Sequence, residues 1–271
     1  MDQSSLFTET KAFLMALAYT QPRILAMFLP IPLFNRQILP GMLRLGIGAG
    51  LGVMVAPALM PLVHATDFSG GQVLALVAKE AFVGFILGCL VAIPFWAFEA
   101  VGFFVDNQRG ASIAASLNPL TGNDSSPLGI LFNQGFIVFF FVSGGFLLML
   151  ELLYDSFRLW DVFSWRPHLR AESAPFLIEQ VTRLIKLALL FSAPVIVAMF
   201  LAELGLAFVS RFVPQLQVFF MAMPIKSAIA MLVVMLYLVT LFDYGLDELA
   251  RLREIVPSLD EQWRAPVDPT R

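Results

Sequence analysis

Six long apolar segments decide which folds are open to this chain of 271 residues. A helix needs about 20 mostly apolar residues to cross the hydrocarbon core of a bilayer. Segments of that kind are predicted at 12–34, 42–63, 81–105, 128–154, 184–209 and 218–242. Charged residues make up only 14% of the chain, whereas they form about a quarter of a soluble protein. We therefore predict an all-α integral membrane protein with about six hydrophobic helical segments.

Prolines and charged residues interrupt these segments. The prolines are Pro22, Pro30, Pro32, Pro57, Pro94, Pro194 and Pro224. The charged residues within or at the margins are Arg23, Glu99, Lys186, Glu203 and Lys226. A proline inside a helix removes a backbone donor and clashes with the preceding turn, and lipid cannot bond the carbonyl that it frees. We expect neighbouring protein or water to satisfy these carbonyls.

Glycines recur at helical spacing in two of the segments. Gly46 and Gly50 form one i, i+4 pair, Gly48 and Gly52 a second, and Gly84 with Gly88 a third. Small residues at this spacing allow helix backbones to approach closely inside a membrane. They predict close helix packing within this chain, against other subunits, or both.

Two sets of intramembrane charges are candidate functional residues, because an ionisable group at membrane depth is costly. Glu99 and Asp106 are seven residues apart, so a continuous helix would place both on one side. Glu203 and Lys226 lie in consecutive segments and could pair across a helical hairpin. A neutralised structural pair and a role in proton or ion coupling both remain open.

The sequence offers no recognisable catalytic, metal or nucleic-acid site. A net charge of −3, without a run of five or more like charges, leaves no basic surface for nucleic acid. The single cysteine, Cys89, cannot form an intramolecular disulfide, and His64 and His168 lie in separate loops without a zinc-binding spacing. No phosphate-binding glycine loop or nucleophile elbow is present. We predict a protein that is not an enzyme and that has no cofactor.

The interval 105–129, VDNQRGASIAASLNPLTGNDSSPLG, is a polar break between two strongly apolar runs. Its centre consists of small residues with two isolated apolar points, Ile113 and Leu117, and Asn118-Pro119 is a turn signal. Such a segment is too polar for a lipid-facing helix, yet more apolar than a solvated loop. It fits a re-entrant or pore-facing loop, and an ordinary external connection remains the alternative.

The distribution of Lys and Arg predicts an orientation. Counted on alternate sides of the six segments, positive charge is concentrated on the side of both chain ends, which predicts cytoplasmic termini. After Asp243 the composition becomes polar, and we expect a helical extension that ends near Pro257.

Two stretches resemble one known family. VDNQRGASIAASLNP follows a long Phe-rich helix, and VFFMAMPIKSAI occupies 218–229. Together they resemble the SctT (YscT, HrcT, SpaR) proteins of type III secretion, which are relatives of flagellar FliR, and the similarity runs from about residue 10 to residue 255. The residues that match the family signature are Phe219, Phe220, Pro224 and Lys226.

The resemblance implies a non-enzymatic subunit of the export apparatus in the bacterial inner membrane. Its partners would be SctR-, SctS- and SctU-type subunits, membrane lipid and the unfolded secreted proteins that pass through the portal. The helical segments would then be hairpins packed in a helical hetero-oligomer. Residues 1–245 would form a membrane-embedded export-gate domain, and 246–271 a cytoplasmic C-terminal tail.

The resemblance also implies a plug-like loop at 106–123. The residues assigned to it are Asp106, Asn107, Gln108, Arg109, Gly110, Ser112, Ile113, Ser116, Leu117, Asn118 and Pro119. The alternative function is that of an ion-coupled secondary transporter, in which Glu99, Glu203 and Lys226 would couple a substrate site to an ion.

Overall fold

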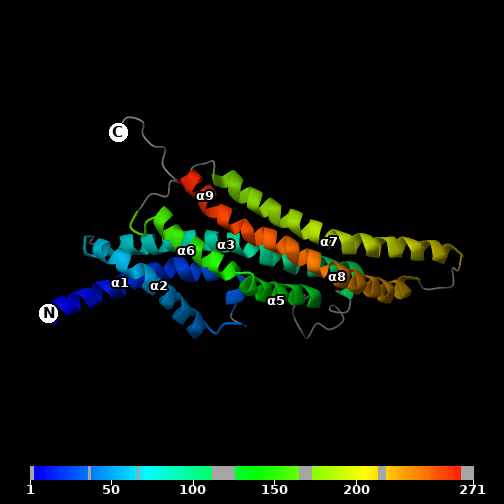
Figure 1. Cartoon of the computed structure of the whole chain (residues 1–271), viewed down its shortest axis with the longest axis horizontal. Helices are drawn as coiled ribbons and strands as arrows, with labels where there is room; N and C mark the ends of the chain where they lie inside the picture. The colour runs from blue at the N-terminus through cyan, green and yellow to red at the C-terminus, as the bar shows by residue number, and fades with distance from the viewer. Residues whose placement is uncertain are drawn as a thin grey trace, which may run out of the picture. The chain divides into compact units, whose positions relative to one another are not determined.

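The chain is helical in the computed structural model, which describes residues 3–35, 38–65, 68–111, 126–164, 173–212 and 218–263 (Figure 1). The first part forms α1 (Gln3–Phe28), the 3-10 helix η1 (Pro32–Phe34), α2 (Gly41–Ala65) and α3 (Gly70–Arg109). The remainder forms α5 (Pro127–Val142), α6 (Gly145–Leu159), α7 (Ser173–Phe212), α8 (Val218–Ala250) and α9 (Leu252–Trp263). The described residues confirm the predicted all-α class.

Four stretches of helix are long and apolar enough to cross a membrane. They are Gly41–Val63, Gly70–Arg109, Pro175–Phe212 and Met221–Leu259. A fifth span would combine α5 and α6, which pass the same test together but meet at an angle of 75°. The chain is therefore an integral membrane protein with four spans, or five with the bent pair, in the described part.

The predicted segment at 12–34 is not among these spans. α1 covers most of it, but the polar run Thr20–Arg23 interrupts the apolar sequence of this helix, which ends at Phe28 before Pro30. Since Thr20 and Arg23 are fully buried, the polar run faces protein. The six predicted segments thus include one helix that is not a span candidate and one broken span.

The break between α5 and α6 lies at Ser143 and Gly144. Gly144 has a φ of +80°, a conformation that residues with a Cβ rarely adopt. The N–H and the hydroxyl of Ser143 donate to the carbonyl of Phe139 at 2.8 and 2.7 Å, so this carbonyl is satisfied without lipid or water. No proline lies in 128–154, and the sequence pattern consequently did not predict the break.

Two compact units share the helices. The first unit comprises 1–92, 145–177 and 251–271, and the second unit comprises 93–144 and 178–250. Helix α3 contributes its first part to the first unit and its last part to the second.

In the first unit, α1 packs against α2 at two of the predicted glycines (Figure 1). A Cβ at Gly48 would lie 3.1 Å from the Leu25 side chain, and one at Gly52 would meet Thr20. Gly46 and Gly50 have nothing within 4 Å of such a Cβ. One glycine pair therefore packs within the chain, whereas the other lines an open face of α2.

Helix α3 packs on α1 even more closely. A Cβ at Gly84 would collide with the backbone of Arg23, and one at Gly88 with the backbone of Met27. The close backbone contact brings Glu80, one turn before Gly84, to the same level as Arg23 on α1. The third glycine pair thus packs within the chain.

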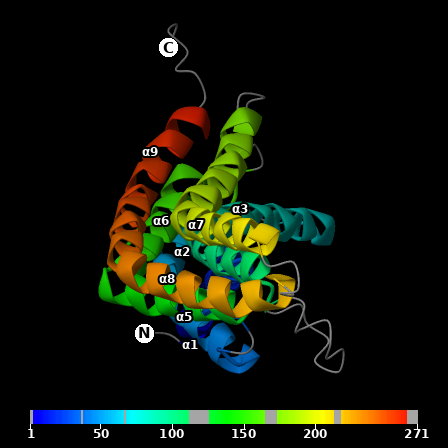
Figure 2. The same cartoon turned by 90° about the vertical axis from the view of Figure 1, so that its right-hand side faces the viewer.

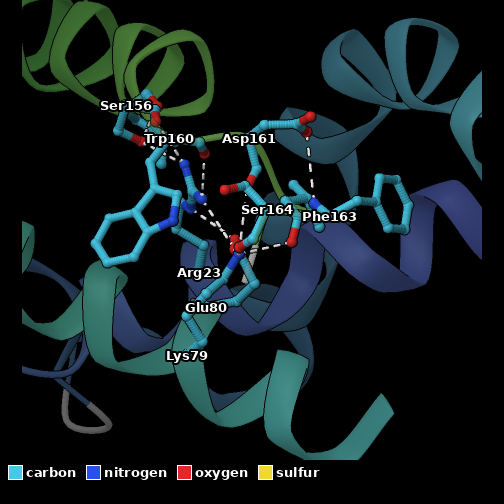
Figure 3. A network of polar contacts seen from close by, with 10 residues as sticks. Arg23, Lys79, Glu80, Ser156, Trp160, Asp161, Phe163 and Ser164 are labelled. Carbon is cyan, nitrogen blue, oxygen red and sulfur yellow. Dashed lines mark hydrogen bonds and ion pairs between the residues drawn. The ribbon is translucent and has the colours of Figure 1, made fainter. Parts of the chain in front are cut away.

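Arg23 is fully buried and makes the central polar contacts of the first unit (Figure 3). Its Nε and Nη2 donate to the two carboxylate oxygens of Glu80 at 2.7 and 3.0 Å. Its Nη1 donates to the carbonyl of Ser156 at 2.7 Å, and Nη2 to the carbonyl of Trp160 at 2.8 Å. One guanidinium group therefore joins α3 to the C-terminal end of α6.

Lys79 extends the same network to the turn that follows α6 (Figure 3). Its Nζ lies 2.9 Å from Glu80 Oε1 and donates to the carbonyls of Asp161, Val162 and Ser164 at 3.2, 2.6 and 2.9 Å. Arg23 and Lys79, both bonded to Glu80, thus donate to backbone carbonyls at and just after the C-terminal end of α6, where carbonyls lack intrahelical partners.

The last helix, α9, belongs to the first unit and lies against α6 (Figure 1). Leu252, Ile255 and Leu259 of α9 are buried. The prediction that the helical extension ends near Pro257 is wrong, since α9 continues to Trp263. Burial of Leu259 beyond the proline offsets the backbone bond that Pro257 removes.

The second unit is built around phenylalanine side chains from four helices. Phe98 of α3 has ring centroids 4.3 Å from Phe136 of α5, 5.8 Å from Phe191 of α7 and 5.5 Å from Phe242 of α8. Figure 2 shows α5 beside α8, whose Gly245 lies against Phe98 and Phe136. Because aromatic rings fill this space, the helices of the second unit have a common apolar core.

Helices α7 and α8 form an antiparallel hairpin with an ion pair toward each end. Arg183 pairs with Glu248, and Glu203 pairs with Lys226. Only 11% of the most apolar window of Met221–Leu259 is buried, compared with 72% for Gly70–Arg109. The described surface of α8 is therefore available to lipid or to other proteins.

We predict that Arg23→Leu destabilises the protein by about 3 kcal/mol, the lower end of the range for breaking a buried ion pair, because Lys79 still contacts Glu80. The measurement is thermal or denaturant unfolding of the protein in detergent. The control is Arg158→Ala, whose side chain is 84% exposed beside Asp155 and whose loss should change stability little. Equal effects of the two substitutions would contradict the role assigned to Arg23.

Candidate functional site

Helix α3 ends inside the interval that the sequence singled out. Asp106, Asn107, Gln108 and Arg109 form its last turn, and Gly110 ends the helix with a φ of +86°. The N–H of Gly110 donates to the carbonyl of Asn107 at 3.2 Å. A glycine in this left-handed conformation is a common helix terminator, so the first part of the interval is a capped helix end.

Asp106 joins this helix end to the start of α5. Its Oδ2 accepts the hydroxyl of Ser126 at 2.6 Å and the N–H of Leu128 at 3.0 Å. Ser126 is the N-cap of α5 and accepts the N–H of Gly129 at 2.8 Å. Asp106 is only 3% exposed, and its carboxylate faces the positive end of the α5 dipole. The two ends of the interval are therefore bonded to each other.

Arg109 connects the same helix end to α8. Its Nη2 lies 2.7 Å from Oδ1 of Asp106, and its Nη1 donates to the hydroxyl of Ser227 at 3.3 Å. Ser227 follows Lys226, so the contact links the interval to the family signature in α8. Arg109 Nε, which is buried, has no hydrogen-bond partner among the described residues.

Lys226 and Glu203 form the predicted ion pair. Lys226 Nζ on α8 lies 2.6 Å from Glu203 Oε2 on α7, and the side chain of Lys226 is 12% exposed compared with 49% for Glu203. Pairing within the hairpin neutralises an otherwise buried ammonium group. The structural interpretation of these two charges is thereby supported.

A cavity of about 390 Å³ lies where these residues meet, entirely within the second unit. It is lined by the end of α3, by α7 and by α8. The lining residues are Asn107, Gln108, Arg109, Gly110, Glu203, Leu206, Ala207, Ser210, Ala222, Met223 and Lys226. The lining combines two cations and one carboxylate with apolar side chains, and the cavity is the candidate functional site.

Glu99 lies outside this cavity. Its Oε2 accepts the side-chain amide of Asn133 at 2.6 Å, so Glu99 and Asp106 both face α5, as their spacing predicts. Among the described residues, Glu99 does not join Glu203 and Lys226 in one site. The described geometry therefore gives no support to a transporter in which these three charges act together.

Several predicted site residues cannot be placed. Ser112, Ile113, Ser116, Leu117, Asn118 and Pro119 lie outside the described residues. Phe219 and Phe220 belong to α8, but their side chains are not described. Pro224 is an exposed residue of α8 beside the cavity-lining Met223. Lys226 and its neighbours therefore locate the family signature at the cavity.

Sequence reasoning did not identify three residues that bond to charged side chains of the two units. Ser126 and Ser227 carry no motif of their own, although a serine before proline at a helix start is a recognisable N-cap signal. Glu80 lies one residue before the segment predicted at 81–105, so its pairing with Arg23 was not considered. A buried arginine in an apolar segment should prompt a search for such a carboxylate.

Comparisons with known proteins agree on one family. The family described as bacterial export proteins, family 1, matches residues 14–252. The chain is 41% identical over 227 residues to Yop proteins translocation protein T of Yersinia pestis, covering 83% of this chain and 86% of that protein. It is 32% identical over 235 residues to the surface presentation of antigens protein SpaR of Salmonella typhimurium, covering 86% of each. It is 30% identical over 223 residues to the flagellar biosynthetic protein FliR of Bacillus subtilis, covering 81% of this chain and 85% of that protein.

We predict that Lys226 and Glu203 are energetically coupled. Lys226→Glu and Glu203→Lys should each destabilise the protein, because each places two like charges side by side, and the double exchange should recover much of the loss. Contacting charges of this kind couple by about 0.5–3 kcal/mol. A double-mutant cycle of unfolding in detergent measures the coupling.

The matched control for this cycle is Ser210→Ala. Ser210 lines the same cavity, but its hydroxyl donates to the carbonyl of Ala207 on its own helix, so its removal should change little. Strictly additive effects of the two charge reversals would show that the ion pair does not stabilise the hairpin.

Proposed function

This chain belongs to the bacterial export proteins of family 1, the SctT, YscT and SpaR proteins of type III secretion that are related to flagellar FliR, and from this premise we propose that it forms part of the export gate. It is a multi-pass protein of the bacterial inner membrane and a component of the export apparatus, not an enzyme. In the proposed role it lines the portal through which unfolded proteins are secreted.

The proposed partners are SctR-, SctS- and SctU-type subunits. Exposed apolar surface supports an assembled state, because the apolar windows of Gly41–Val63 and Met221–Leu259 are only 22% and 11% buried. Gly46 and Gly50 add an open small-residue face to α2. Membrane lipid would cover whatever part of this surface the partner subunits leave. Residues 1–245 would then be the membrane-embedded part, and 246–271 the cytoplasmic end.

The proposed gating element is the plug-like loop 106–123 within the interval 105–129. One cavity carries the proposal. It is lined by the first residues of this loop, by Glu203 of α7 and by Lys226 of the family signature in α8. Asn107–Gly110, Glu203 and Lys226 all line it. A segment that begins at this cavity is well placed to respond when a polypeptide occupies the neighbouring space.

In the proposed resting state, the interval obstructs the channel. Its small side chains at 110–116 suit a narrow lumen, and Ile113 and Leu117 would seal it by apolar contact. Asn107, Gln108 and Arg109 would meet water or partner subunits. The energy for export would come from other components, since this chain supplies positioning and obstruction alone.

Deletion of residues 112–119 should raise the ion conductance of the assembled export complex several-fold. The reason is that the deletion removes the obstructing segment, whereas the capped ends of α3 and α5 remain. Conductance of the purified complex in planar bilayers, with subunit composition verified, is the measurement.

The control is deletion of residues 264–271, which has the same length and lies at the chain end. It should leave conductance at the level of the intact complex. If the internal deletion assembles normally and conducts no more than this control, the interval is not a plug.

A further inference from the structure

Asp106 is the residue on which the ends of the interval meet. We propose that it is a positioning residue that ties the two ends of the interval 105–129 together through Oδ2 of its side chain. The effect of this tie on export rests on the proposed gate function. The tie itself is measured as a distance between α3 and α5, without transport.

The polar half of the tie is a shared helix cap. Asp106 Oδ2 receives both the hydroxyl of Ser126 and the N–H of Leu128, and Ser126 in turn receives the N–H of Gly129. Two consecutive N–H groups at the start of α5 are thereby satisfied by side chains. Without Asp106, a buried amide of α5 would lose its acceptor.

The apolar half of the tie is a direct backbone contact one turn earlier on α3. A Cβ at Gly102 would collide with the backbone of Leu128 and Gly129. The helices therefore touch at the same two residues whose N–H groups are capped. Because the packing contact and the hydrogen bonds act at one point, they fix where α3 and α5 cross.

Arg109 balances the charge of Asp106 without contacting the oxygen that bonds to α5. The guanidinium contacts Oδ1, whereas both bonds to α5 go to Oδ2. A neutral amide can also accept a hydrogen bond at a helix start. The geometry therefore predicts that Asp106→Asn, whose oxygen can take the place of Oδ2, keeps the tie to α5 but loses the contact with Arg109, and that Asp106→Ala removes the tie.

The test is a spin-label distance between Phe103→Cys on α3 and Ile130→Cys on α5, in the full assembled complex and with Cys89 replaced by serine. Phe103 and Ile130 are 45% and 47% exposed, so labels can be attached beside the tie without entering it. Pulsed electron paramagnetic resonance should give a narrow distribution with Asp106 intact and with Asp106→Asn. Asp106→Ala should lose the narrow peak.

The matched control is Glu99→Ala. Glu99 lies two turns earlier on α3 and also bonds to α5, through Asn133, but Glu99 is itself exposed, so the narrow peak should persist. Should Asp106→Ala fail to assemble, Ser126→Ala removes one donor and the cap of Gly129, and should broaden the distribution. A narrow peak in whichever of these two variants assembles would overturn the proposal, as would equal broadening in Asp106→Asn and Asp106→Ala.

Secretion by the same variants separates this inference from the gate. If the tie positions the interval for export, secretion of a reporter substrate should fall in Asp106→Ala and be retained in Asp106→Asn. Normal secretion by Asp106→Ala with a broadened distribution would overturn the positioning role. Failure of the gate itself would instead appear as unchanged conductance after deletion of 112–119, whatever the spin-label distances show.

Discussion

Helix ends buried in a membrane protein must find polar partners within the protein, and the broken pair α5 and α6 depends on this constraint. The buried N–H of Leu128 at the start of α5 meets the carboxylate of Asp106, and the carbonyl of Ser156 near the end of α6 meets the guanidinium of Arg23. In each case the charge has the sign that the helix dipole favours. These charges thus satisfy the outer ends of the broken pair, while Ser143 satisfies the Phe139 carbonyl at the break itself.

The sequence predicted the class of fold from hydrophobicity alone, and it predicted the pairing of Glu203 with Lys226 from their positions in consecutive segments. It did not predict the bend at Gly144, because a glycine permits a left-handed conformation without requiring one. Nor did it predict the partners of Arg23 and Asp106, since Glu80 and Ser126 are distant in sequence from them or carry no motif. Such contacts depend on how helices cross, which hydrophobic periodicity does not encode.

Family membership and geometry contribute different parts of the functional account. Membership identifies a membrane component of the type III secretion and flagellar export apparatus. The geometry of the second unit brings the start of the polar interval beside Lys226 and Glu203, around one cavity. Arg109 connects this region to α8 through Ser227, so bonded side chains link the cavity to the end of α3 and, through Asp106, to the start of α5.

The central claim is that Asp106 joins the end of α3 to the start of α5 at the base of the interval. Electron cryomicroscopy of the assembled export complex, at a resolution that shows side chains, tests it most directly. The account predicts the Asp106 carboxylate within hydrogen-bond distance of the Ser126 hydroxyl and the Leu128 N–H, with Arg109 beside it. An Asp106 side chain directed away from α5, with the start of that helix bonded elsewhere, would contradict it.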